Sequence, residues 1–366
     1  MASIAKQPNG RYKVRYRTPE GKDRAARFDR KVDAQRFAAT VEADKTRGVF
    51  VDPRAGRITF AEWHGRWTVS TVDLRPSTRA RDESYARNHV LPRFGHRTLS
   101  SVEHLDVVEW VAELAASGMA PATVHKCHQI LAKCLRAAVR ARLIPFNPCD
   151  GVPLPRVECH EMRFLDPRQL AGLADVINPR FRAFVLLGGY GGLRLGEMLG
   201  LRRERVDLLR RQVEVAEILV EVRGQITYGP PKTSAGRRSV SVPRVVSDAL
   251  DRTLASVKPG GLVFTSSEGT PVRASLFRRR VWAPAVKAAG LEPLRIHDLR
   301  HTAVAVWIAA GASPKEIAVR AGHTSVSVVL DRYGHLLPGS EERVTDALDV
   351  MASAAADSQA SVRPLR

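Results

Sequence analysis

Cysteine is scarce in this sequence. Its 366 residues include only Cys127, Cys134, Cys149 and Cys159, and no C-x-x-C pair. These spacings match neither a disulfide framework nor a zinc site, so we expect reduced and mostly packed thiols. No apolar run approaches the roughly 20 residues that a membrane helix needs. The N-terminal stretch MASIAKQPNGRYKVRYR has no apolar h-region, so neither a membrane span nor a secretory signal is expected.

Several common catalytic motifs are also missing. No H-E-x-x-H occurs, so a zinc hydrolase has little support, and no G-x-x-x-x-G-K occurs, which argues against a P-loop ATPase or helicase. The glycine run at 188–192 lacks the Lys and Ser/Thr of a phosphate-binding loop. No cluster of carboxylates resembles the site of a two-metal nuclease. We therefore expect neither a metal nor a cofactor.

Acidic residues are few relative to basic ones. Lys and Arg number 58 against 38 Asp and Glu, which gives a net charge of +20 and a pI near 10.6. Such an excess favours a polyanionic partner, nucleic acid first and an anionic membrane second, although a solvated basic surface would also account for it. A chain of this length has room for two or three domains.

The N-terminal residues predict a small basic β unit. Cationic and apolar residues alternate along Arg11–Arg17, so a strand here has one largely aromatic face and one cationic face. A turn, a returning strand over 24–28 and a helix over 31–47, capped by Asp29, complete residues 1–57. This segment carries 15 Lys and Arg against 7 Asp and Glu. It could bind DNA or be an ordinary half-exposed sheet, and we favour the first. The candidate DNA-binding residues are Arg11, Lys13, Arg15 and Arg17.

Residues 58–150 predict a bundle of four helices with one basic side. A capping box at Thr59 opens the first helix. The next three are expected at 77–90, ending before Pro92, at 101–116 and at 122–143. Lys126 and Lys133 on the last helix are candidate DNA contacts, although a solvated face explains them nearly as well. The prolines and glycine of 151–162 predict a linker.

Residues 163–352 predict a mixed α and β domain. Strands are expected at 213–222, at 239–242 and, as a short one, at 263–264. A helix starts at Asp166–Pro167, and others are expected at 245–256, 275–289, 297–310, 314–321, 325–332 and 341–352. Residues 353–366, rich in Ala and Ser, predict a disordered tail.

The same segment holds residues suited to phosphoryl transfer. Two Arg side chains can bind the non-bridging oxygens of a phosphate through bidentate hydrogen bonds. Lys or His can supply a proton to the leaving oxygen, and Tyr can form a covalent intermediate. His297, Arg300 and His301 follow helical spacing and face one side. The candidates are Arg194, Lys232, His297, Arg300, His301, His323 and Tyr333.

The order and surroundings of these residues resemble the tyrosine recombinases of the phage-integrase type. Gly192-Leu-Arg-Leu-Gly-Glu197 resembles the family's first box, and His297-Asp-Leu-Arg-His301 its second. Ala321-Gly-His323 resembles its L-G-H element, with Ala in place of Leu, and Asp331-Arg-Tyr-Gly-His335 its nucleophile segment. Lys232 matches the family's β-hairpin lysine but has no firm motif of its own.

The resemblance implies a chemistry and a fold. Tyr333 would attack a DNA phosphate and form a 3′-phosphotyrosyl bond, with Arg194, Arg300 and His323 on the phosphate. Lys232 would protonate the leaving oxygen. His297 would assist, either as an acid–base group or by positioning Tyr333, while Glu197 and His301 would support the site. The predicted fold is multidomain: a small sheet-plus-helix arm-binding domain, an all-α core-binding domain and a mainly helical α+β catalytic domain.

The resemblance also implies partners. These are double-stranded DNA attachment sites, three further copies of the chain in a tetramer on DNA, a host DNA-bending protein and a directionality factor. No membrane is involved, and the location would be the cytoplasm of a bacterial host. The helix at 341–352 would dock on a neighbouring copy.

Two rival functions remain open on the sequence. A type IB topoisomerase shares the same residue types and would relax a single duplex as a monomer. A non-enzymatic DNA-binding protein could use 313–333 as a helix-turn-helix, but this reading leaves Arg194, Lys232 and the second box unexplained.

Overall fold

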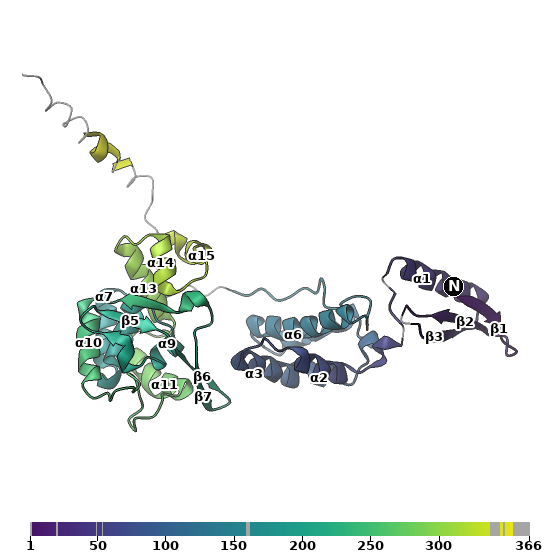
Figure 1. The fold of residues 1–366 in the computed structure, drawn as a ribbon, viewed down its shortest axis with the longest axis horizontal. Coiled ribbons are helices and arrows are strands. Elements are labelled where there is room, and N and C mark those ends of the chain that lie inside the picture. The colour runs from purple at the N-terminus through teal and green to yellow at the C-terminus, as the bar shows by residue number, and fades with distance from the viewer. Residues whose placement is uncertain are drawn as a thin grey trace, which may run out of the picture. The chain divides into compact units, whose positions relative to one another are not determined.

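The computed structural model describes residues 2–19, 21–48, 50–52, 54–158, 162–336, 345–346 and 348–353. The chain divides into two compact units, Met1–Cys159 and His160–Arg366. Figure 1 shows a small sheet, then helices, then a larger and mostly helical part. None of the helices in the described ranges combines the length and the apolar character that a membrane span requires.

The N-terminal sheet has three antiparallel strands in the order β1-β2-β3. They are β1 (Ser3–Lys6), β2 (Tyr12–Arg17) and β3 (Asp23–Phe28), and α1 (Lys31–Thr46) follows them. Val14 and Tyr16 of β2 are buried with Ala34 and Val41 of α1, which confirms the predicted alternation. Strand β1 was not predicted, because its four residues are all exposed and show no alternation.

The predicted cap of α1 is wrong. Arg30 occupies the N-cap position without a side-chain hydrogen bond. Asp29 instead forms an ion pair with Arg11 at 2.7 Å. A carboxylate beside a cationic strand has a competing partner, and sequence position alone does not show which one it takes.

The helical region of the first unit contains α2 (Phe60–Ser70), α3 (Pro76–Tyr85), α4 (Leu91–Phe94), α5 (His104–Ala116) and α6 (Pro121–Arg140). The capping box of Thr59 and Glu62 is present as predicted.

The second helix does not end before Pro92. A wider π-helical turn at Ala86–Val90 joins α3 to α4, and Pro92 lies in the first turn of α4, where its missing N–H is tolerated. Helix α5 starts three residues later than predicted, and α6 ends at Arg140, before Arg142 adopts a positive φ.

Residues 148–155 are tied to this helical region. Cys149 and Val152 are buried in its core, and Leu154 packs against it. Three histidines of α5 and α6 also hydrogen-bond to backbone carbonyls of the same stretch: His104 to Pro148, His125 to Pro155 and His128 to Cys149. The first part of the predicted linker is therefore held along these helices, and the domain boundaries themselves stay a prediction.

The second unit surrounds two small sheets with helices. Its helices are α7 (Pro167–Val176), α8 (Arg182–Gly191), α9 (Leu195–Leu199), α10 (Arg244–Leu254), α11 (Ala274–Phe277), α12 (Ala283–Ala288), α13 (Asp298–Ala309), α14 (Pro314–Ala321) and α15 (Ser327–Tyr333). Its strands are β4 (Val206–Asp207), β5 (Gln212–Val215), β6 (Ile218–Val222), β7 (Gln225–Gly229) and β8 (Arg238–Ser241). One sheet has the order β4-β5-β8, and β6 and β7 form a separate hairpin.

Two strand predictions need correction. The stretch 213–222 forms two strands in different sheets, because the chain breaks the ladder between Val215 and Ile218. Residues 263–264 form no strand, and only isolated bridges, Arg202 with Leu262 and Thr265 with Pro271, flank them. The helix expected at 341–352 lies partly outside the described residues, although 345–346 and 348–353 are helical. The expected tail lies outside them from residue 354.

The position of the site depends on close packing between α8 and α13. Gly188 of α8 is so close to Leu299 of α13 that a Cβ atom there would lie 2.7 Å from a Leu299 methyl group. Leu299 is fully buried, so it has little room to move. Residues 188–191 of the glycine run belong to α8, and Gly192 follows as its C-cap. The missing side chain of Gly188 allows α13 to approach the segment that carries Arg194.

We predict opposite effects of alanine at two glycines of this unit. Gly188→Ala should lower the free energy of unfolding by about 1–3 kcal/mol, because it overpacks the contact with Leu299. Gly172→Ala in α7 should raise it by up to about 1 kcal/mol, because nothing lies within 4 Å of the added methyl group and alanine favours a helix. Denaturant unfolding of both variants tests this. If both substitutions change the free energy of unfolding in the same direction, the packing argument is contradicted.

Candidate functional site

Arg194 is held at the start of α9 with one side open to solvent. Its backbone N–H donates to Oε2 of Glu197 (2.9 Å), and its Nη1 donates to Oε1 of the same carboxylate (2.7 Å). Its Nη2 donates to the carbonyl of Gly322 (3.2 Å). The side chain is still 40% exposed. Arg194 is thus fixed in direction and remains accessible to a ligand.

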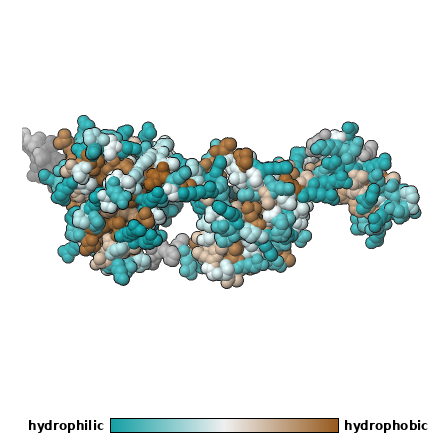
Figure 2. All heavy atoms as spheres, turned by 90° about the horizontal axis from the view of Figure 1, so that it is seen from below, coloured by the Kyte–Doolittle hydropathy of each residue, from teal (hydrophilic) through white to brown (hydrophobic). Residues whose placement is uncertain are grey.

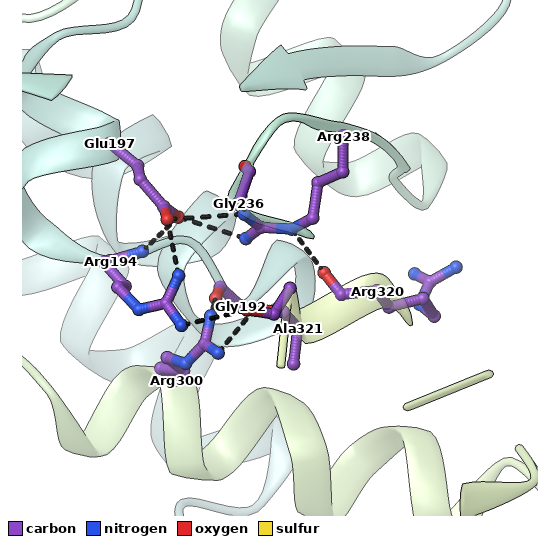
Figure 3. Close-up of polar contacts among 9 residues, drawn as sticks. Gly192, Arg194, Glu197, Gly236, Arg238, Arg300, Arg320 and Ala321 are labelled. Carbon is purple, nitrogen blue, oxygen red and sulfur yellow. Dashed lines mark hydrogen bonds and ion pairs between the residues drawn. The ribbon is translucent and has the colours of Figure 1, made fainter. Parts of the chain in front are cut away.

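Glu197 is buried between two guanidinium groups. Arg238 of β8 donates to both of its carboxylate oxygens, at 3.0 and 3.3 Å, opposite Arg194 (Figure 3). Burial disfavours the charged carboxylate, but Arg238 and Arg194 outweigh this effect and leave the pKa of Glu197 below its usual value. Glu197 therefore stays ionised and links the two arginines.

Arg300 is almost fully buried, with 3% of its surface exposed. Its two terminal nitrogens donate to backbone carbonyls, Nη1 to Gly192 (2.7 Å) and Nη2 to Ala321 (2.5 Å) (Figure 3). Burial, reinforced by the positive charge of Arg194, lowers the pKa of Arg300 to about 9, so the group remains charged at neutral pH. Arg300 thus places a cation between the segment before Arg194 and the end of α14.

A cavity of about 390 Å³ brings four of the predicted residues together. Arg194, Lys232 and His323, from distant parts of the sequence, line it together with the supporting Glu197. Lys232 lies in the loop between β7 and β8 with its side chain exposed. His323 follows Gly322, which ends α14 in the left-handed conformation (φ +63°). The turn predicted at Gly322 therefore presents His323 to the same cavity as Arg194.

Tyr333 does not line this cavity. It is the last residue of α15 and is 1% exposed, packed among residues of α13 and α14. Its hydroxyl forms a 2.6 Å hydrogen bond with Nδ1 of His301. The ring of His297 contacts the edge of His301, with 4.9 Å between centroids. The structure thus brings His301 to the tyrosine, and His297 reaches it only through His301.

The histidines and the tyrosine of this site are uncharged at neutral pH. Burial, with His297 nearby, lowers the pKa of His301 to about 4, and burial, with Arg300 and Arg194 nearby, lowers that of His323 to about 4. Partial desolvation and the same two arginines also lower the pKa of His297. Burial raises the pKa of Tyr333 despite the opposing charges of Arg300 and Arg332.

We expect the free energy of unfolding to fall as the pH drops from about 6.5 towards 4. In this interval the unfolded chain binds protons at His301, with an ordinary pKa of 6.5, whereas the folded protein does not until pH 4. Stability therefore rises with pH here. Denaturant unfolding at several pH values should give a shallower slope for His301→Gln than for the unchanged protein. An identical slope would show that His301 does not titrate in this way.

One residue of this arrangement was missed from the sequence, namely Arg238. Its side chain is 6% exposed, whereas the adjacent Arg237 is exposed. The alternation of a strand could have distinguished Arg238 from Arg237. Alternate residues of a strand lie on the same face, so Arg238 lies on the face of Val240 and Val242, which are buried. The part of the chain that the structure describes contains no group of three or more His, Cys, Asp and Glu residues suited to a metal ion.

The candidate DNA-binding residues lie on two surfaces of the first unit. On β2, Arg15 and Arg17 are exposed, and Lys13 is partly so. Arg11 pairs with Asp29, and Arg17 donates to the carbonyl of Gly21. Lys126 and Lys133 are exposed on α6, opposite its buried face. The face of the sheet unit seen in Figure 2 is mainly hydrophilic.

Comparison with protein families gives two matches. Residues 163–339 match the phage integrase family, and residues 59–115 match the N-terminal SAM-like domain of phage integrases. Among individual proteins, the ICEBs1 integrase of Bacillus subtilis is 26% identical, over 95% of this chain and 99% of that protein.

Solved structures with a similar fold include two integrases. The Tn1549 transposon integrase in complex with a circular intermediate DNA has a TM-score of 0.68 and 21% identity, and the match covers 75% of this chain and 95% of that one. A lambda integrase tetramer bound to a Holliday junction has a TM-score of 0.57 and 18% identity, and the match covers 88% and 95%. These similarities agree with a small N-terminal sheet, a helical region and a mainly helical C-terminal unit.

Proposed function

Because the chain belongs to the phage integrase family, we propose that it is a site-specific DNA recombinase that cleaves and rejoins DNA through a 3′-phosphotyrosyl intermediate, and so integrates or excises a mobile element. The observation that carries the mechanism is the cavity lined by Arg194, Lys232 and His323, with the buried Arg300 beside it. Four cationic or hydrogen-bonding groups converge there, as a phosphate in a transition state requires.

Arg194 and Arg300 are the proposed phosphate ligands. Arg194 is partly exposed, and Nη2 has a second N–H beyond the one donated to Gly322. Each terminal nitrogen of Arg300 also keeps one N–H after its bond to a carbonyl. His323, uncharged at neutral pH, can donate one hydrogen bond to a non-bridging oxygen. Glu197 supports this group by holding Arg194 in place.

Tyr333 is the proposed nucleophile, and it must leave its buried position to reach the cavity. The phenolic oxygen forms the new bond to phosphorus while the bond to the 5′ oxygen breaks. His301, unprotonated and in hydrogen-bond contact with the phenol, is suited to accept the proton. Lys232 is suited to protonate the leaving 5′ oxygen. His297 supports His301 from its edge, so of the two roles left open by the sequence, acid–base chemistry and positioning of Tyr333, we assign it positioning.

The proposed reaction exchanges one phosphate ester for another. The number of ester bonds stays the same in cleavage and in rejoining, so the chemistry consumes no nucleotide. The 3′ end stays bonded to Tyr333 through its phosphate, and the released 5′ end is free, until the 5′ hydroxyl of a second strand attacks that phosphate. Strand exchange between two duplexes requires that the number of phosphate ester bonds be conserved in this way.

The other parts of the chain support a role on attachment sites. We propose that 1–57 is an arm-type DNA-binding domain, 58–150 a core-binding domain, 151–162 a linker and 163–352 the catalytic domain. We also propose that four copies act together, as in the lambda integrase tetramer on a Holliday junction, with a host DNA-bending protein and a directionality factor as further partners. We propose that the reaction takes place in the cytoplasm of a bacterial cell, and the similarity to the ICEBs1 integrase of Bacillus subtilis supports this.

The two rival functions differ from this proposal in their products. A type IB topoisomerase would relax any supercoiled plasmid and yield no recombinants. A helix-turn-helix protein would form no covalent adduct. The second rival has little support, because Gly322 and His323, at its supposed turn, line the same cavity as Arg194.

Capture of covalent adducts tests the proposal without knowledge of the attachment site. The protein is incubated with random double-stranded fragments, adducts are recovered under denaturing conditions, and the attached peptide and DNA are both sequenced. We expect a phosphotyrosyl peptide containing Tyr333 and one recurring DNA sequence. Two plasmids carrying that sequence should then recombine. Relaxation without recombinants would favour the topoisomerase, and no adduct on any fragment would overturn the proposal.

We predict that Arg15→Gln weakens binding to DNA flanking the cleavage site. Among the described residues no ion pair joins Arg15 to an acid, so it is free to contact a phosphate. The log–log dependence of affinity on salt should become shallower by about one unit. Arg11→Gln should change it less, because Asp29 already neutralises Arg11. Gel-shift titrations at several salt concentrations decide this, and an unchanged slope for Arg15→Gln would remove β2 from the interface.

A further inference from the structure

We propose that Arg238 is a positioning residue for cleavage, which fixes Arg194, the Lys232 loop and the turn before His323 relative to one another. The inference rests on the proposed function, since it concerns the same site. Arg238 itself does not line the cavity. It acts on the phosphate through Glu197 and Arg194, and on the loop and the turn through backbone carbonyls.

The hydrogen bonds of Arg238 reach all three segments. Nη1 and Nη2 donate to Glu197, the partner of Arg194 (3.3 and 3.0 Å). Nη1 also donates to the carbonyl of Gly236, in the loop that carries Lys232 (3.0 Å). Nε donates to the carbonyl of Arg320, near the end of α14 (2.7 Å). Figure 3 shows the guanidinium between these acceptors.

Only a guanidinium suits this set of acceptors. Four of its five N–H groups are used, in a planar arrangement that extends in three directions. The ammonium group of a lysine has three donors at a single point and cannot reach the same four oxygens. The side chain is 6% exposed, so water would not readily replace a lost bond.

The turn at Gly322 packs directly against Arg238. A Cβ atom on Gly322 would lie 2.8 Å from the carbonyl oxygen of Ala235 and 3.0 Å from Nη1 of Arg238. The turn that presents His323 and the loop that carries Lys232 are therefore in contact at this point. Arg238 binds to both sides of that contact, so its loss should let the two catalytic segments separate.

Arg238 also shares the charge of Glu197. With Arg238 present, a single carboxylate faces two guanidinium groups, and Arg194 keeps net positive charge for a phosphate. Without Arg238, the carboxylate would be balanced by Arg194 alone. The phosphate would then compete with Glu197 for the same guanidinium, and the transition state would lose stabilisation.

The test compares single-turnover cleavage of two substrates built on the captured site. One has a normal phosphodiester at the cleavage point, and the other has a methylphosphonate, which lacks the negative charge that Arg194 would bind. Arg238→Gln should slow cleavage of the phosphodiester on the order of 10- to 100-fold and leave DNA affinity within about twofold. On the methylphosphonate the loss should shrink to a few-fold, because the misplaced Arg194 matters less there.

Arg203→Gln is the matched control. Arg203 also donates to backbone carbonyls of the same unit, those of Leu254 and Val257, and does not line the cavity. It should cleave both substrates at the rate of the unchanged protein. If Arg238→Gln does not fold, Arg238→Lys, which retains the buried charge, should give the same pattern with a smaller loss. An equal loss on both substrates, or none, would overturn the inference. Failure of the unchanged protein to form any adduct would count against the proposed function instead.

Discussion

Replacement of Tyr333 by phenylalanine is expected to abolish the covalent protein–DNA adduct while leaving DNA affinity within about twofold. The phenolic oxygen is the atom that bonds to phosphorus in the proposed mechanism, and phenylalanine has no substitute for it. Loss of a nucleophile that acts together with its catalytic partners costs on the order of 10⁴-fold or more in rate. A nicked suicide substrate, which traps the adduct by releasing the 5′ fragment, measures this loss directly.

The same substitution has a structural consequence that must be separated from the chemistry. Tyr333 is 1% exposed, so the surrounding apolar cluster should accept a phenylalanine ring. The ring nitrogen of His301 loses its partner, which costs about 1–3 kcal/mol. A thermal or denaturant melt should show a moderate loss of stability and no loss of the folded state. The absence of an adduct then reports the missing hydroxyl group.

Tyr228→Phe provides the control for this experiment. Tyr228 lies on β7 of the same unit and is 37% exposed, so it is more accessible than Tyr333. The variant should form the adduct at the normal rate. If Tyr333→Phe still forms the adduct and Tyr228→Phe does not, Tyr333 is not the nucleophile.

Local features of this protein were predictable because their causes lie within a few residues. The capping box predicted at Thr59 and the helix start predicted at Asp166 are both present, and Asp166 also forms a capping box. The alternation along β2 depends only on the two faces of a strand. The left-handed turn at Gly322 likewise follows from a residue type that tolerates positive φ. Such signals identified most helices and two of the three strands of the first sheet, β2 and β3.

Contacts between distant segments were beyond such signals. Strand β1 forms by pairing with β2, as at Ile4 with Val14, and its four exposed residues show no alternation that predicts a strand. The sequence likewise shows that Arg238 follows Arg237, but not that Glu197, 41 residues earlier, completes its ion pair. The burial of Tyr333 depends on three helices that pack together. Sequence therefore supplied the inventory of the site, and the tertiary fold decided which residues touch.

Arg194→Lys is expected to slow cleavage about 10²- to 10³-fold, which corresponds to roughly 2.7–4 kcal/mol of transition-state stabilisation. Lysine preserves the charge and can still pair with Glu197. It lacks the planar fork that can hold Glu197, the carbonyl of Gly322 and a phosphate oxygen together. DNA affinity should change little, because one charge among many contributes to binding. Single-turnover cleavage at saturating protein isolates the chemical step.

Arg202→Lys is the matched control, because Arg202, like Arg194, is partly exposed and donates to a carboxylate and to a backbone carbonyl, that of Gly260. It is 35% exposed, pairs with Glu217 at 3.0 Å and lies in the same unit, but it does not line the cavity. Its substitution should leave the cleavage rate within a few-fold of normal. Equal losses for both variants would mean that removal of any paired arginine weakens the domain. A normal rate for Arg194→Lys would show that charge alone binds the phosphate and that the bidentate geometry of Arg194 contributes nothing to catalysis.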